Sequence, residues 1–250
     1  MGKGGGCVPS KNRASITVSD PDPDHPPPPQ EKKSAAQSHN PPGEIARNLR
    51  IFIVYYSMYG HIELLAKRIK RGVDSVDGVE GVLFKVPETL PPKTLEQMKV
   101  PAKDDSVPVI EVEKMVEADG FLFGFPTRYG SMAAQMKSFF DSTIDLWKDQ
   151  RLAGIPAGLF VSTGTQGGGQ ETTALTAVSL LAHHGMVYVP IGYTFGSEMT
   201  NIDTIRGGSP YGAGVLSGDG SRPPSSTELH LAHHQGKYMA TLLKRSLPRS

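Results

Sequence analysis

Apart from Arg50, the residues from Leu49 to Tyr56 are apolar and form a run of strand length that is rich in Ile and Val. Such a run is typical of a strand covered on both faces, as in a parallel sheet. It ends at small polar residues. Beyond them, apolar residues recur at helical spacing, at Ile62, Leu65, Ala66, Ile69, Val73 and Val76. The pattern therefore predicts a strand that enters a helix through a short Ser/Gly turn.

The same alternation continues along the chain. Strands are predicted at 81–86, 120–125, 158–162 and 187–189, and helices at 111–117, 132–147, 171–184 and 226–245. Strands that alternate with helices in this way indicate one α/β domain with a doubly wound, five-stranded parallel sheet in flavodoxin-like order. In such a sheet, ligands bind beyond the carboxyl ends of the strands, where the strand order reverses.

The turn from Ser57 to Ile62 is the first of three loops expected at that edge. It brings unpaired backbone N–H groups and the positive end of a helix dipole to one small space, which suits a phosphate. The turn matches neither a GxGxxG fingerprint nor a P-loop. A monophosphate held by Ser57 Oγ and the following amides therefore fits better than a dinucleotide or a nucleoside triphosphate.

Two further loops follow predicted strands. Pro126 to Ser131 combines hydroxyls, a cation and an aromatic ring, which suits a planar, electron-accepting ligand, although ordinary turn and N-cap chemistry is an alternative. Ser162 to Glu171 contains three consecutive glycines, which allow backbone amides to approach a ligand closely, although a flexible surface loop is an alternative. We favour binding, because all three loops are expected at one edge of the sheet.

Composition limits the other function classes. Lys and Arg number 26 against 25 Asp and Glu, so no net charge attracts the chain to nucleic acid, and no nucleic-acid motif is present. The one cysteine, Cys7, allows no internal disulfide. No apolar stretch has the length of a membrane span or signal sequence. These features favour a reduced, cytoplasmic setting.

The first 48 residues are dominated by Gly, Pro, Ser and Asp. A segment with so few large apolar residues cannot offset the entropy that it would lose on ordering. We therefore expect a disordered arm at 1–48. The start, Met-Gly-Lys-Gly-Gly-Gly-Cys, leaves two alternatives: acylation of Gly2 or Cys7, with peripheral attachment to the plasma membrane, or a plain extension. The myristoylation pattern requires Ser or Thr where Gly6 stands, which counts against Gly2.

Five segments, in order, resemble the WrbA family of flavodoxin-like NAD(P)H:quinone oxidoreductases: YYSMYGHIE, PTRYGSMAAQMKSFFD, STGTQGGGQE, LLAHHGMVYVPIGY and GGSPYGA…GDGSRPPS. The likeness runs from about Leu49 to the end, and the glycine-rich start is similar to that of longer-tailed eukaryotic members. The resemblance implies an FMN-binding domain at 49–250 and non-covalent FMN. It also implies a homotetramer built of dimers, or a homodimer, that reduces quinones by two electrons with NADH or NADPH.

The resemblance further implies which residues contact FMN. The phosphate loop corresponds to Ser57, Met58, Tyr59, Gly60, His61 and Ile62, and the flavin-ring loop to Thr127, Arg128 and Tyr129. The third loop corresponds to Ser162, Thr163, Gly164, Thr165, Gln166 and Gly167, in which Gln166 is an insertion relative to bacterial members. His183 corresponds to a histidine at the FMN edge. Trp147 corresponds to an aromatic residue that lines the substrate pocket from a neighbouring subunit.

Without the resemblance, simpler interpretations stay open for the histidines and the tryptophan. His183 at a helix end could satisfy the last carbonyls, and Trp147 could belong to the core. His230, His233 and His234 recur at helical spacing, but no Cys or carboxylate signature accompanies them. We expect a solvated helix face there, and no metal site.

The resemblance favours an NAD(P)H dehydrogenase (quinone) that works by a ping-pong mechanism. Because no second nucleotide-binding domain is predicted, NAD(P)H and the quinone must use one pocket in turn. Two other classes remain open from the residues alone. One is a one-electron flavodoxin-type carrier, for which the nearly neutral charge is unusual, and the other is a flavin-free adaptor protein that uses the arm to bind partners.

Overall fold

A computed structural model describes residues 47–246. The predicted disordered arm at 1–48 therefore falls almost entirely outside the described residues, and so do Gly2 and Cys7. The two-domain division into an arm and a body stays a prediction.

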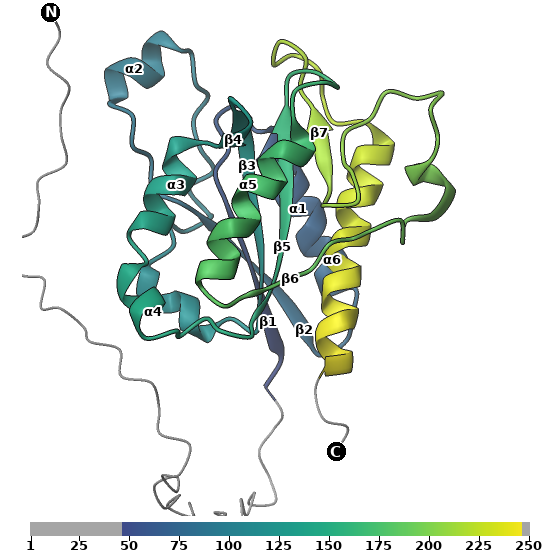
Figure 1. Ribbon diagram of the computed structural model, residues 1–250. Coiled ribbons are helices and arrows are strands. Elements are labelled where there is room, and N and C mark those ends of the chain that lie inside the picture. The colour runs from purple at the N-terminus through teal and green to yellow at the C-terminus, as the bar shows by residue number, and fades with distance from the viewer. Residues whose placement is uncertain (1–46, 247–250) are drawn as a thin grey trace, which may run out of the picture. The chain divides into compact units, whose positions relative to one another are not determined.

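One parallel sheet forms the centre of the described chain (Figure 1). Its order is β2-β1-β3-β5-β6, so β2 lies at one edge and β6 at the other. These strands are β1 (Leu49–Tyr55), β2 (Val79–Lys85), β3 (Gly120–Arg128), β5 (Pro156–Thr163) and β6 (Val187–Tyr188). All their pairings are parallel, which confirms the predicted doubly wound, flavodoxin-like sheet.

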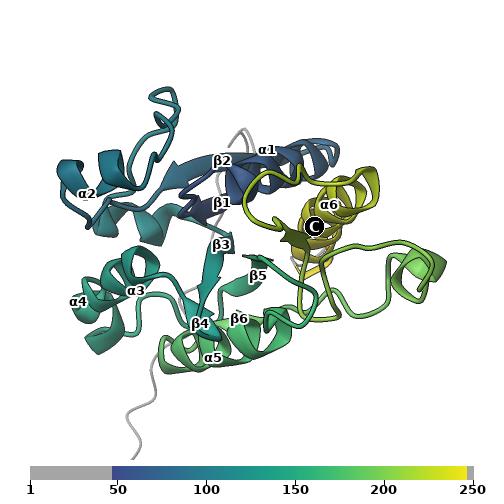
Figure 2. The ribbon, with the colours of Figure 1, turned by 90° about the horizontal axis from the view of Figure 1, so that it is seen from above.

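Helices cover both faces of the sheet, as the view from above shows (Figure 2). On one face lie α1 (His61–Asp74) and α6 (Ser226–Ser246). On the other lie α3 (Ala134–Asp141), α4 (Ile144–Lys148) and α5 (Gln170–His183). A short helix, α2 (Pro92–Gln97), and a 3-10 turn at Val112–Glu117 lie in the connection between β2 and β3.

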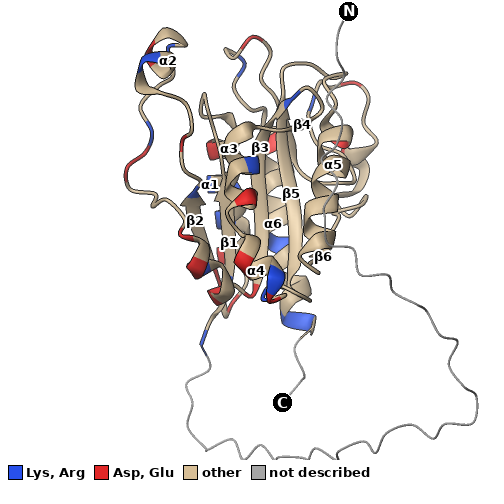
Figure 3. Cartoon of the chain, turned by 60° about the vertical axis from the view of Figure 1, so that its left-hand side comes forward, with Lys and Arg blue, Asp and Glu red and all other residues tan. Residues whose placement is uncertain are grey.

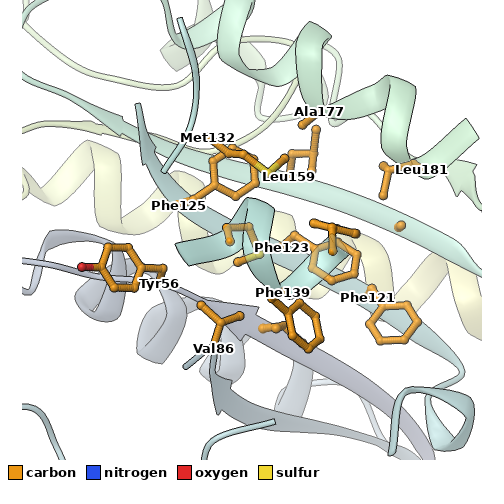
Figure 4. Close-up of a cluster of buried hydrophobic side chains, with 14 of the residues drawn as sticks. Tyr56, Val86, Phe121, Phe123, Phe125, Met132, Phe139, Leu159, Ala177 and Leu181 are labelled. Atoms are coloured by element: carbon orange, nitrogen blue, oxygen red, sulfur yellow. The ribbon is translucent and has the colours of Figure 1, made fainter. Parts of the chain in front are cut away.

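Alternating side chains of β3 fill the two layers of the core. Phe121, Phe123 and Phe125 point toward α3 and α5 and are fully buried (Figure 4). The rings of Phe121 and Phe123 stack with their centroids 5.1 Å apart. Leu122 belongs instead to the second layer, beneath α1 and α6. β3 is therefore apolar on both faces, as is typical of a strand in a parallel sheet.

The helices α1 and α6 approach each other so closely that a glycine is needed on each. A Cβ atom on Gly72 would lie 2.0 Å from the carbonyl oxygen of His233. A Cβ atom on Gly236 would lie 2.1 Å from the carbonyl oxygen of Ile69. Neither site has room for a methyl group, so the two backbones are in direct contact. This contact fixes the position of α1, whose first turn faces the candidate site.

The predicted helix at 132–147 is wrong in one respect, because it is two helices. The break falls between Asp141 and Ile144, where two successive hydroxyls bond back to the main chain. Ser142 Oγ donates to the carbonyl of Phe139 at 2.6 Å, and Thr143 Oγ1 donates to that of Phe140 at 2.7 Å. Such side-chain bonds compete with the helical ladder.

Two short strands were not predicted. β4 (Ser131–Met132) folds back antiparallel onto the end of β3. β7 (Gly214–Leu216) pairs in parallel with the carboxyl-terminal half of β5, whereas β6 pairs with its amino-terminal half. The edge position is therefore shared by two strands, and residues 189–213 connect them outside the sheet. This detour delivers the loop after β7 to the carboxyl edge.

Charged residues are spread over helices and loops, and both signs are interspersed (Figure 3). The central strands β3 and β5 carry one charge between them, Arg128 at the carboxyl end of β3. Among the helices of residues 47–246, none is both long and apolar enough to cross a membrane.

Candidate functional site

Four loops meet around a cavity of about 270 Å³ at the carboxyl edge of the sheet. They follow β1, β3, β5 and β7. The lining residues are Ser57, Met58, Tyr59, His61, Ile62, Pro126, Thr127, Arg128, Ser162, Thr163, Gly164, Ser217, Gly218, Asp219 and Gly220. The structure thus brings together ten of the predicted site residues. We call this space the rim cavity.

The first loop presents backbone donors to the rim cavity. Gly60, with φ of 92°, lies just before α1, and its N–H donates to Ser57 Oγ at 3.1 Å. This left-handed conformation favours glycine. Within the described residues, the N–H groups of Met58 and Tyr59 donate no hydrogen bond. Together with the positive end of α1, these free donors make a site for an anion.

The second loop adds a cation. Arg128 reaches across to the first loop, where its Nη2 lies 3.5 Å from Met58 Sδ. Thr127 Oγ1 lies 2.9 Å from Thr173 Oγ1, which anchors the loop to α5. Tyr129 does not line the rim cavity and is fully exposed, at 106% of its reference area. Its ring could cover a ligand only from outside.

The third loop is held by its own side chains and by α5. Thr163 Oγ1 donates to the carbonyl of Thr165 at 2.9 Å and accepts from Gln170 Nε2 at 3.1 Å. Gln166 and Gly167 do not line the rim cavity but a neighbouring cavity of about 610 Å³. Of the contacts predicted for this loop, the residues up to Gly164 line the rim cavity and those after Gly164 do not.

The fourth loop, Ser217 to Gly220, was missed by the sequence analysis. Its place depends on β7, since the N–H of Ser217 donates to the carbonyl of Thr163 at 2.8 Å. Farther along, the carbonyl of Arg222 lies 3.0 Å from His61 Nε2, so the fourth loop contacts the first. The turn-rich composition around Gly218 was visible in the sequence, but its position on the sheet edge was not.

A buried carboxylate, Glu228 at the start of α6, holds the fourth loop. Its side chain has 0% exposure. It accepts from the N–H groups of Gly207, Leu216 and Ser225 at 2.7–2.9 Å, and from Arg222 Nη1. Burial raises the pKa of Glu228, but the hydrogen bonds outweigh burial and hold this pKa below its ordinary value of 4.5. The carboxylate thus joins the end of β7, two further backbone segments and one cation.

Trp147 and His183 do not reach the rim cavity of their own chain. Both lie near the amino-terminal ends of the parallel strands, where β6 begins: His183 ends α5, and Trp147 is in α4. Gln150 connects them, since its Nε2 donates to the carbonyl of Trp147 at 2.7 Å and to that of His183 at 3.4 Å. Trp147 is 41% exposed, so it is not a core residue.

The rim cavity is suited to binding rather than to nucleophilic catalysis. Its donors are mainly backbone N–H groups, with one guanidinium at Arg128 and the hydroxyls of Ser57, Thr127 and Ser162. Asp219, the carboxylate among its lining residues, already accepts from the N–H and Oγ of Ser221. In the part of the chain that the structure describes, no three His, Cys, Asp or Glu residues are grouped to hold a metal.

Comparisons with known proteins agree with this geometry. Residues 51–200 match the family model of NADPH-dependent FMN reductase. A relative from Arabidopsis thaliana, named probable NAD(P)H dehydrogenase (quinone) FQR1-like 2, is 56% identical over 98% of each chain. Quinone-oxidoreductase QR2 of Triphysaria versicolor is 62% identical over 78% of this chain and 96% of its own.

A solved structure supports the fold. The flavodoxin, WrbA-like protein from Agrobacterium tumefaciens superposes with a TM-score of 0.57. The alignment covers 80% of this chain and all of that one, at 19% sequence identity. At this level of identity the likeness concerns the arrangement of strands and helices alone.

Proposed function

The chain belongs to the NADPH-dependent FMN reductase family, and we propose that it is an FMN-dependent NAD(P)H dehydrogenase that reduces quinones. The observation that carries this proposal is the rim cavity, where free amides at the start of α1 face loops from three other strands. An anion site next to a groove lined by backbone suits a phosphorylated, planar cofactor. The names of the relatives supply the substrates, NAD(P)H and a quinone.

We place the phosphate of FMN at Ser57 to Ile62, where Ser57 Oγ and the amides of the following residues would bind it. Thr127, Arg128 and Tyr129 would contact the ring from one loop, and Ser162 to Gly167 from another. Thr165 to Gly167 do not line the rim cavity, so we assign the main contacts to Ser162, Thr163 and Gly164.

Bound FMN supplies a ring that takes a hydride from NAD(P)H and gives two electrons to a quinone. The balance is NAD(P)H, a proton and a quinone in, and NAD(P)⁺ and a hydroquinone out. The chain's residues bind and orient the reactants, and backbone amides near the ring stabilise negative charge there. Since the described chain has one flavodoxin-like domain and no second nucleotide-binding domain, we propose that the two substrates enter the rim cavity in turn.

Steady-state kinetics test this proposal. With FMN-loaded protein, NADPH and benzoquinone varied together should give parallel double-reciprocal lines, because the first product leaves before the second substrate binds. One hydroquinone should form per NADPH consumed. Free FMN at the same concentration is the control. Intersecting lines would exclude the shared cavity, and NADPH oxidation that serves only one-electron acceptors would favour a carrier.

We also propose that Trp147 and His183 act on a neighbouring subunit. Both lie at the end of the sheet that is away from the rim cavity of their own chain, and they are close together. They could therefore complete the rim cavity of a second copy in a homodimer or homotetramer. Trp147 would line the quinone pocket, and His183 would lie at the flavin edge. Sedimentation that finds single chains only would exclude this arrangement.

Attachment to the plasma membrane through acylated Gly2 or Cys7 is a further proposal, supported by the glycine-rich start. Mass spectrometry of the native N-terminus distinguishes the alternatives. An unmodified Gly2 and Cys7 would leave the arm as an extension of an enzyme in the cytoplasm.

A further inference from the structure

Lys103 lies behind the phosphate loop, on the side away from the rim cavity. Its Nζ donates to the carbonyl of Met58 at 2.9 Å and also to the carbonyl of Ser57. The ammonium lies 5.6 Å from the centre of the Tyr56 ring. Lys103 comes from the long connection between β2 and β3, so a segment distant in sequence contacts the loop that follows β1.

The segment that carries Lys103 is itself anchored. The next residue, Asp104, accepts from Lys67 Nζ of α1 at 2.9 Å through its carboxylate. Its carbonyl accepts from Lys85 Nζ of β2 at 2.6 Å. Lys103 is therefore presented by a fixed backbone rather than by a free loop, and its ammonium is half-buried.

Lys103 binds the carbonyls of Ser57 and Met58, and the direction of these carbonyls determines the direction of the next two backbone N–H groups. In a trans peptide, the C=O of one residue and the N–H of the next point in opposite directions. Because the carbonyls of Ser57 and Met58 face Lys103, the N–H groups of Met58 and Tyr59 face away from it. That direction leads to the rim cavity, which Ser57, Met58 and Tyr59 line and Lys103 does not. Neither of these two N–H groups has an acceptor within residues 47–246.

The ammonium also balances nearby negative charge. Behind the loop is a second cavity of about 230 Å³, whose charged lining residues are Lys103 and Lys85 together with Glu63, Glu88 and Asp105. Without nearby cations, these carboxylates would oppose the binding of an anion on the other side of the loop. Burial lowers the pKa of Lys103, while Glu88 and Glu63 act to raise it. The same lysine thus orients the donors and offsets the carboxylates behind them.

We propose that Lys103 is a positioning residue for the cofactor phosphate, which turns the amides of Met58 and Tyr59 toward it and makes the site prefer FMN over riboflavin. This inference rests on the proposed function, because it takes the anion at the start of α1 to be the FMN phosphate. Because Lys103 does not line the rim cavity, it would touch neither the flavin ring nor the substrates.

The test is the affinity of flavin-free protein for two flavins, measured by quenching of flavin fluorescence. Lys103→Met keeps the length of the side chain and removes its charge. We expect it to weaken FMN binding about 30-fold, as for the loss of charged hydrogen bonds. Riboflavin, which has no phosphate, should bind within about twofold of its wild-type affinity. Lys103→Arg, which keeps two donors and the charge, should restore part of the FMN affinity.

Lys93→Met is the matched control, because Lys93 is an exposed residue of α2. An equal loss of FMN and riboflavin affinity in Lys103→Met would show a general structural role and overturn the inference. An unchanged FMN affinity would overturn it as well, while the proposed function would stand. If the wild-type protein binds neither flavin, the proposed function itself fails, and the inference fails with it.

Discussion

Replacing Glu228 with glutamine is expected to lower the free energy of unfolding by about 3 kcal/mol, because it removes a fully buried carboxylate that is paired with a partly exposed arginine and accepts three backbone hydrogen bonds. The carboxylate accepts from three backbone N–H groups and from Arg222, and a glutamine amide would turn a donor toward some of them. Chemical denaturation, monitored by circular dichroism, measures the change. Because Glu228 also holds the loop that follows β7, FMN affinity should fall in the same variant.

The effect of Glu228→Gln should depend on pH. The pKa of Glu228 is lower in the folded chain than in the unfolded chain. Its charge therefore stabilises the fold at pH values above the pKa of the unfolded chain, and this stabilisation is lost as the pH falls through the pKa of the folded chain. The gap between wild type and variant should therefore stay constant from about pH 7 to about pH 5 and shrink as the pH falls below 4.5, the ordinary pKa of a glutamate. Glu80→Gln, at an exposed carboxylate on the edge strand β2, is the control and should change stability by about 0.5 kcal/mol at most. A Glu228→Gln protein as stable as wild type at neutral pH would contradict this account.

Replacing Gly72 with alanine is expected to destabilise the fold by about 3 kcal/mol, at the upper end for an overpacked core. The new methyl group would lie 2.0 Å from the carbonyl oxygen of His233, so α1 and α6 would have to separate. Helix propensity alone predicts the opposite sign, since alanine is favoured over glycine in a helix interior by about 1 kcal/mol. Denaturation curves of the two proteins decide between these signs.

Arg71→Ala is the control for this substitution, because Arg71 is the exposed neighbour of Gly72 in α1. It should leave stability within about 0.5 kcal/mol of wild type. A Gly72→Ala protein that is more stable than wild type would mean that the two helices are not in the close contact described.

The sheet order and the main strands could be predicted from sequence because their signals are local. The Ile- and Val-rich run at 49–56 and the helical period after it each lie within a few turns of chain. β7 could not be found in this way. Its three residues are too few for a periodic pattern, and its partner, β5, lies about 50 positions earlier in the chain.

The phosphate loop and the two flavin loops could be proposed from sequence because each follows a predicted strand at the same edge. The residues that support them could not. Lys103 and Glu228 lie in a Pro-rich loop and at the start of the last helix, where a charged residue is ordinarily a solvated one. Only tertiary contacts place Lys103 against the carbonyls of Ser57 and Met58 and bury Glu228.

The most direct test of the central claim is a crystal structure of the protein with FMN. We predict that the phosphate lies against Ser57 Oγ and the amides that begin α1, with the ring between the loops at Thr127–Arg128 and Ser162–Gly164. An empty rim cavity, or FMN bound in the neighbouring cavity beside Gln166 and Arg206, would contradict the account.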